Sequence, residues 1–131
     1  LMMTSFDPSV LTIPFAHAEE KVWTKDMVKE FARNIANEHK LNVQHFLHTL
    51  NREKGFNSTG QSECVDKNGE REDSWGACQI NLYFNPTITR EQAENPAFCI
   101  PWMAKEWSEG RAWKWAAWKL YEKDGWPTET L

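Results

Sequence analysis

Residues 50–81, LNREKGFNSTGQSECVDKNGEREDSWGACQIN, decide the fold because they place a polar, turn-rich segment between two helical regions. At its start, Gly55 follows an apolar helical pattern and occupies the position that favours a left-handed helix end. At its centre, Asn68-Gly69 is typical of a two-residue hairpin turn. The stretch therefore predicts a helix that ends at Gly55 and leads into a β-hairpin.

The charges beside the Asn68-Gly69 turn agree with a hairpin. A two-residue loop sets Asp66 opposite Arg71 and Lys67 opposite Glu70, which are two pairs of opposite charge. Cross-strand pairs of this kind stabilise antiparallel strands. The sequence predicts that this hairpin is small and faces solvent.

Two helices are expected before the hairpin. Thr24 suits the N-cap of a helix that continues to about residue 39, with apolar residues at helical spacing. Asn42 suits the N-cap of a second helix, which ends at Gly55.

Helices resume behind the hairpin. The capping-box pair Thr89 and Gln92 predicts a short helix to about residue 94. Asn95-Pro96 begins a longer helix in which Pro101 is expected to cause a kink. A last helix is expected over 112–123. The predicted fold class is therefore mostly α (α+β), with a small hairpin inserted after the second helix.

Composition limits the function classes. The chain has 131 residues, 40% hydrophobic and 26% charged, which fits one soluble domain with a single core. A net charge of −4 argues against general nucleic-acid binding. No run approaches the roughly 18 apolar residues of a membrane span. We expect a monomer with a domain over 24–125 and a tail over 126–131.

Residues 1–23 have two interpretations. Ala16-His17-Ala18 has the small-x-small form of a signal-peptidase site and follows a short apolar run. Against a signal, Pro14 interrupts that run and no basic region precedes it. The segment is either the remnant of an export signal or an arm packed on the domain, and the pattern slightly favours an exported protein.

Glu53 is the residue that indicates chemistry. It follows Leu50 by three positions and Phe46 by seven, so it lies on the apolar face of its helix. It also lies in the last turn, where the helix dipole disfavours a negative charge. Both effects raise a carboxyl pKa, and a carboxylic acid still protonated near neutral pH is suited to general-acid cleavage of a glycoside. The alternative is a helix-end glutamate that reaches into solvent.

Two motifs around the hairpin add a family likeness. Glu53-Lys54-Gly55-Phe56-Asn57 and Gly76-Ala77-Cys78-Gln79-Ile80, in this order, resemble the lysozyme-like superfamily, and most closely bacterial lytic transglycosylases and phage muramidases. The likeness covers roughly residues 24–122. It implies cleavage of the β-1,4 MurNAc–GlcNAc bond of peptidoglycan without a cofactor, in the periplasm, the cell wall, a secreted protein or a phage. Glu53 would then be the general acid and base.

The same likeness implies substrate-binding residues. Gln79 would line the cleft and contact a sugar, although it could instead satisfy local backbone groups. Trp75 could stack on a sugar ring, and Ser74 stands beside it. Tyr121 belongs to the helix that takes the place of the family's Ala-Tyr-Asn segment. That missing segment, and Lys54 where the family has Ser, are departures that affect substrate positioning and the choice of subfamily.

A second carboxylate would decide the mechanism. A retaining hydrolase needs one about 5 Å from the acid, whereas a lytic transglycosylase uses the 6-hydroxyl of the sugar itself. Glu72 and Asp73 precede the Gly-x-x-Gln motif, and adjacent strand residues point to opposite faces, so at most one faces Glu53. We favour Asp73, and both hydrolysis and transglycosylation stay open.

The tryptophans and cysteines have mostly structural interpretations. The eight Trp include Trp102, Trp107 and Trp113 on faces assigned to the core, while Trp115 and Trp118 share a face that could be a ligand platform or an interface. One disulfide among the three cysteines is possible without an identified pair. The three cysteines are Cys64, Cys78 and Cys99. His45 and His48 have a spacing that can hold a metal, but no third ligand is evident, so no metal is assigned.

Three alternatives to this enzyme remain. The first is a catalytically inactive glycan-binding domain on the same fold, favoured by Lys54 and the missing segment. The second is an interaction domain of a virion or secretion machine, with a Trp surface that binds protein. The third is a glycosidase directed at chitin or chitosan.

Overall fold

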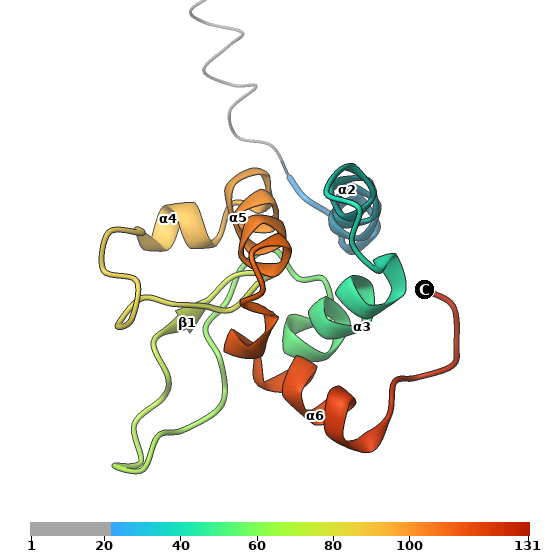
Figure 1. Cartoon of the computed structure of the whole chain (residues 1–131). Helices are drawn as coiled ribbons and strands as arrows, with labels where there is room; N and C mark the ends of the chain where they lie inside the picture. The colour runs from blue at the N-terminus through green and yellow to red at the C-terminus, as the bar shows by residue number, and fades with distance from the viewer. Residues whose placement is uncertain (1–21) are drawn as a thin grey trace, which may run out of the picture.

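The computed structural model, which describes residues 22–131, consists of helices and a small two-stranded antiparallel sheet that lies to one side of them (Figure 1). This confirms the predicted mostly α class with a minor β component. The predicted N-terminal segment, residues 1–23, lies outside the described residues except for its last two. None of the helices in the described part combines the length and apolar character needed to cross a membrane.

The first two helices begin and end as predicted. Helix α2 spans Lys25–Glu38 and helix α3 spans Val43–Lys54. The side chains of Thr24 and Asn42 each accept a backbone N–H from the first turn of their helix. Gly55 ends α3 in the left-handed conformation, with φ of 60°. Local capping chemistry therefore sets the boundaries of both helices.

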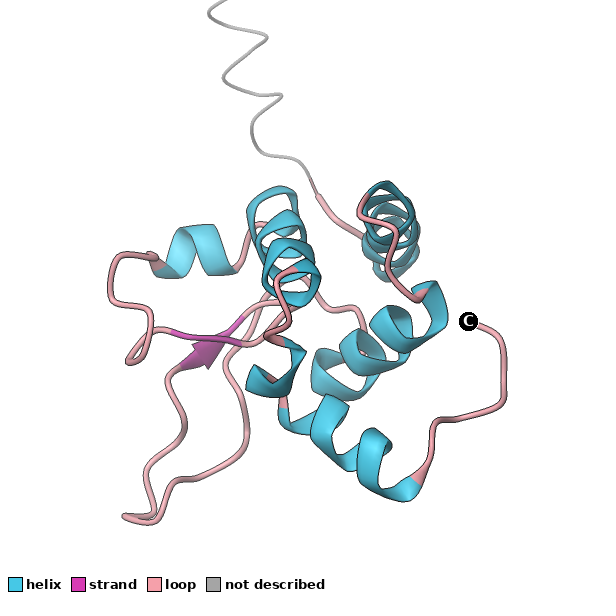
Figure 2. Ribbon diagram, in the orientation of Figure 1, coloured by secondary structure: helices cyan, strands magenta, loops and turns pink. Residues whose placement is uncertain are grey.

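The regular strand pair forms one turn later than predicted. Strand β1 (Ser74–Trp75) pairs with strand β2 (Ile80–Asn81) around the turn at 76–79. The predicted hairpin around Asn68-Gly69 is present only as two isolated bridges, one of which joins Val65 to Arg71. The segment that carries these bridges, residues 60–73, forms a mostly exposed arm that extends away from the helices (Figure 2).

The predicted charge pairs across that arm are wrong. Because Val65 lies opposite Arg71, the loop has three residues and Asp66 faces Glu70. The Asp66 carboxylate instead accepts the backbone N–H of Asn68 at 2.8 Å and that of Glu70 at 3.0 Å. Arg71 donates to backbone carbonyl oxygens. An Asp that can bond its own turn competes with a cross-strand ion pair.

Two further helices follow the sheet. Helix α4 (Arg90–Ala93) begins with the predicted capping box of Thr89 and Gln92. Helix α5 (Pro96–Ser108) begins at the Asn95 cap and continues through Pro101.

The predicted last helix is divided into two. A 3-10 turn, η2 (Ala112–Lys114), precedes helix α6 (Ala116–Asp124), and Trp115 between them has extended backbone with φ of −98° and ψ of 123°. This break turns the Trp115 indole into the core, where its Nε1 donates to the Cys78 carbonyl oxygen at 2.8 Å. Burial of the Trp115 indole therefore accounts for the break in the helix that the local sequence pattern predicts.

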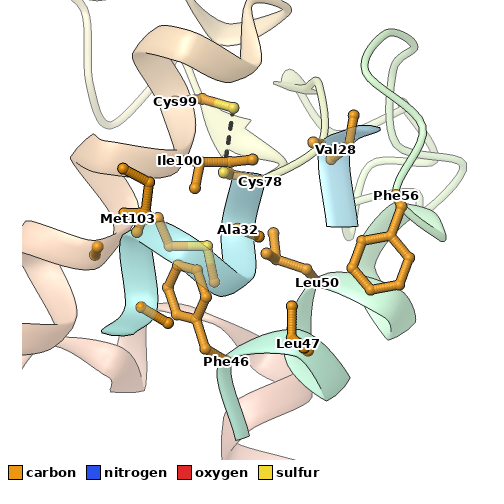
Figure 3. Packing of buried hydrophobic residues seen from close by; sticks show 14 of the residues in the cluster. Val28, Ala32, Phe46, Leu47, Leu50, Phe56, Cys78, Cys99, Ile100 and Met103 are labelled. Carbon is orange, nitrogen blue, oxygen red and sulfur yellow. Dashed lines mark hydrogen bonds between the residues drawn. The ribbon is translucent and has the colours of Figure 1, made fainter. Parts of the chain in front are cut away.

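The core lies between α2, α3 and α5 (Figure 3). Two cysteines, Cys78 behind β1 and Cys99 on α5, are fully buried in it with their Sγ atoms 3.2 Å apart. Cys64 is exposed on the arm. The largest fully buried apolar side chains are Phe46, Leu47, Leu50, Ile80, Ile100, Met103 and Val28.

The C-terminal tail packs along α3 beside the core. Gln44 and Leu131 exchange two hydrogen bonds, of 2.8 Å and 3.2 Å. Trp126 stacks on the His45 ring, with centroids 3.7 Å apart and planes at 5°. The tail thus covers the side of α3 that faces away from α5.

Candidate active site

Glu53 lies in the last turn of α3 and points at the beginning of α6. Its side chain is half-buried, and its Oε2 accepts the backbone N–H of Ala117 at 3.3 Å. The alternative of a helix-end glutamate directed into solvent does not fit this contact. The helix break at Trp115 brings the first amides of α6 to the carboxyl group.

Burial raises the pKa of Glu53 above its ordinary value. The Ala117 N–H opposes this effect, since it stabilises the charged form, while the negative charge of Glu72 adds to it and Arg52 opposes it. The net effect is a raised pKa, as the sequence predicts. Its main cause is desolvation.

The carboxylate whose charge acts on Glu53 is Glu72. Glu72 is half-buried and its Oε1 accepts the Ser74 hydroxyl at 3.4 Å, whereas Asp73 is exposed and accepts the Trp75 Nε1 at 2.7 Å. Residues 72 and 74 thus share one face of the chain, and 73 and 75 share the other. Of the two adjacent carboxylates, Glu72 rather than the favoured Asp73 is therefore the one whose charge acts on Glu53.

Gln79 satisfies local backbone groups, which is one of its two expected roles. It adopts a left-handed backbone with φ of 51°, and its Nε2 donates to the carbonyl oxygens of Gly76 at 2.8 Å and Gly60 at 3.3 Å. This amide ties the β1–β2 turn to the arm. Gln79 also lines a hollow of about 430 Å³, which is described below, so it stays a candidate for ligand contact.

Two predicted binding residues are placed poorly for a ligand. Ser74 is buried, so a sugar has no direct access to it. The Arg90 guanidinium lies 3.9 Å from the Trp75 ring centroid and covers one face on which a sugar would stack. Tyr121 lies one turn beyond Ala117 and has the Arg52 guanidinium 5.0 Å from its ring centroid, so it borders the site.

The described residues form two hollows, and Glu53 lines the smaller one. The smaller, of about 320 Å³, contains Glu53 and lies between the end of α3 and the arm. The larger, of about 430 Å³, lies between β2, the middle of α5, η2 and the beginning of α6. Its lining consists of Gln79, Ile80, Asn81, Phe84, Asn85, Trp102, Trp113, Lys114, Trp115 and Lys119.

The larger hollow contains residues that the sequence analysis missed or assigned wrongly. Trp113 was expected in the core but is 54% exposed, whereas Trp115, a candidate for a platform, is buried. Phe84 and Lys119 were not singled out. Residues 112–123 contain neither Gly nor Pro, so no local signal marks the break that exchanges the two tryptophans.

Within residues 22–131, no three His, Cys, Asp or Glu side chains are grouped in a way that could hold a metal ion. No family model, curated protein or solved structure matches this chain.

Proposed function

We propose that this protein has a lysozyme-like fold and cleaves the β-1,4 MurNAc–GlcNAc bonds of peptidoglycan, with Glu53 as the proton donor. The observation that supports this most directly is the half-buried Glu53 carboxyl, whose pKa is raised and which lines a hollow of about 320 Å³. Burial favours the protonated form of this carboxyl, which is the form that a general acid requires.

Glu53 serves in both halves of the proposed reaction. Its proton passes to the glycosidic oxygen as the bond to C1 breaks, and positive charge develops on the sugar ring. The resulting carboxylate then accepts a proton from the group that attacks C1. That group is either water, which gives a reducing end, or the 6-hydroxyl of the same sugar, which gives a 1,6-anhydro product. The charge of Glu72 supports the first step because it helps to keep Glu53 protonated.

The test is digestion of purified peptidoglycan by the wild type and by Glu53→Gln, with products identified by mass spectrometry. The substitution keeps the shape of the side chain and removes its proton, so we expect cleavage to fall by about 10³-fold. Glu63→Gln is the matched control, because Glu63 lines the same smaller hollow but is exposed. It should retain most activity.

The products separate the two reaction types. Anhydro ends identify a lytic transglycosylase, and reducing ends identify a hydrolase and make Glu72 the next residue to replace. Full activity in Glu53→Gln, or no product from the wild type, would contradict the proposal. In the second case, binding without cleavage would favour an inactive glycan-binding domain.

A further inference from the structure

The larger hollow has a buried aromatic floor and an exposed aromatic rim. Trp115 is buried, and Trp102 packs edge-to-face against it with centroids 5.8 Å apart. Phe84 and Trp113 also line the hollow, yet they are 76% and 54% exposed. Large apolar side chains gain little in solvent, so two of them at the rim of one concave site indicate ligand contact.

The loop that carries Phe84 holds it in this exposed position. The Asn81 Oδ1 accepts the backbone N–H of Tyr83 at 2.9 Å and that of Phe84 at 3.2 Å. Asn85 closes the turn, since its Nδ2 donates to the Asn81 carbonyl oxygen at 2.8 Å. The side chain is therefore presented before any ligand arrives, which lowers the entropic cost of binding.

The hollow also carries an uncompensated positive charge. Two lysines line it, and the Nζ of Lys114 lies 3.0 Å from the Oε1 of Glu106, which neutralises it. Among residues 22–131, no ion pair involves Lys119. A cation at the rim of an apolar hollow attracts a ligand that combines an apolar face with a negative charge.

We infer that this hollow binds a pyranose ring that bears its own carboxylate, with the ring in contact with Phe84 and Trp113 and the carboxylate facing Lys119. The lactyl ether of N-acetylmuramic acid has this chemistry, whereas a chitin sugar lacks the carboxylate. The identity of the sugar rests on the proposed function. The volume of about 430 Å³ falls within the size range of small-molecule sites.

The test measures binding by calorimetry in a Glu53→Gln background, which leaves the oligosaccharide intact. The two probes are a peptide-free GlcNAc–MurNAc tetrasaccharide and neutral chitotetraose. We expect the background protein to prefer the anionic probe by about tenfold, as one charge-assisted hydrogen bond allows. Lys119→Gln should abolish this preference. Lys123→Gln, which removes another exposed lysine of α6 outside the hollow, should keep it.

A second pair of variants tests the aromatic contact. Tyr83 and Phe84 are neighbours with the same exposure of 76%, but only Phe84 lines the hollow. Phe84→Ala should weaken binding of both probes by about tenfold. Tyr83→Ala removes a ring that packs edge-to-face on Phe84 with centroids 5.1 Å apart, and it should weaken binding clearly less. Thermal unfolding of each variant shows that it is folded.

Equal affinity for the two probes, or a preference that survives Lys119→Gln, would overturn the inference. Loss of binding in Tyr83→Ala equal to that in Phe84→Ala would also overturn it. These outcomes are independent of the cleavage test: a wild type that prefers the anionic probe but releases no product supports this site and contradicts the proposed enzyme. Cleavage by a protein that shows no preference for the anionic probe supports the proposed enzyme and contradicts this site.

Discussion

At the scale of single residues, the ionised Glu53 side chain lowers the free energy of unfolding. Its carboxylate is removed from water near the negative charge of Glu72, and one backbone N–H at 3.3 Å is the only hydrogen bond that it accepts within the described residues. Burying a charge with so few partners disfavours the folded state. A side chain of the same shape without the charge avoids this cost.

We therefore expect Glu53→Gln to have a higher melting temperature than the wild type at pH 7. The folded protein keeps the Glu53 proton to a higher pH than the unfolded chain, so the free energy of unfolding falls as the pH rises from 4.5 to the raised pKa. Below pH 4 both states are protonated and the difference should disappear. Calorimetry of the two proteins from pH 3 to pH 8 measures it.

The exposed Glu63→Gln should change the melting temperature little at either pH. A Glu53→Gln variant that is less stable than the wild type at pH 7 would contradict the expectation.

Glu53 could be identified from the sequence, but its partner could not. Helical spacing places Glu53 on the apolar face, and this survives an error of a residue at the helix end. The choice between Glu72 and Asp73 depends on which of these two adjacent side chains faces Glu53, and a register shift of one residue exchanges them. The loop at 67–69 has three residues and not the expected two, so the sequence alone does not determine which side chain faces Glu53.

At the scale of elements, the β1–β2 turn depends on one close approach. A Cβ on Gly76 would lie 1.9 Å from the carbonyl oxygen of Ala93 at the end of α4, and the φ of Gly76 is +80°. Backbone atoms cannot move aside without displacing the helix. This contact positions the turn that carries Gln79 at the larger hollow.

Gly76→Ala should lower the free energy of unfolding by about 3 kcal/mol or more, because steric overlap adds to the strain of a left-handed residue. Gly69→Ala is the matched control, since Gly69 has the same φ of +80° with nothing within 4 Å. It should cost only about 1 kcal/mol. Urea denaturation measures both, and similar losses in the two variants would show that strain alone decides.

Element boundaries with side-chain caps were predictable, while the break before α6 was not. Thr24, Asn42 and Thr89 each satisfy an amide within three residues, so the sequence contains the cause. The break at Trp115 arises from a hydrogen bond to Cys78, 37 residues away. Local patterns carry no information about such a partner.

At the scale of the whole molecule, the tail and the core hold α3 from two sides. Trp126 lies between the rings of His45 and Tyr121, at 3.7 Å and 5.0 Å, and its Nε1 donates to Glu122 at 2.7 Å. The tail thereby joins α3 to α6, the two helices whose ends meet at Glu53.

Trp126→Ala should lower the free energy of unfolding by about 2 kcal/mol, since it removes a stacked and half-buried ring. Thr128→Ala, an exposed change in the same tail, should stay within about 0.5 kcal/mol of the wild type. Chemical denaturation measures both. Equal effects would mean that the tail adds little through its aromatic contact.

Burial of the two sulfur atoms slows any change in their redox state after the protein has folded. Cys78 and Cys99 lie in contact with no exposed surface, and burial raises the pKa of the Cys78 thiol. Oxidants and reductants in solution therefore reach these sulfur atoms only when the chain opens. Both are free thiols in the structure, so we expect their redox state to change only as fast as the chain unfolds.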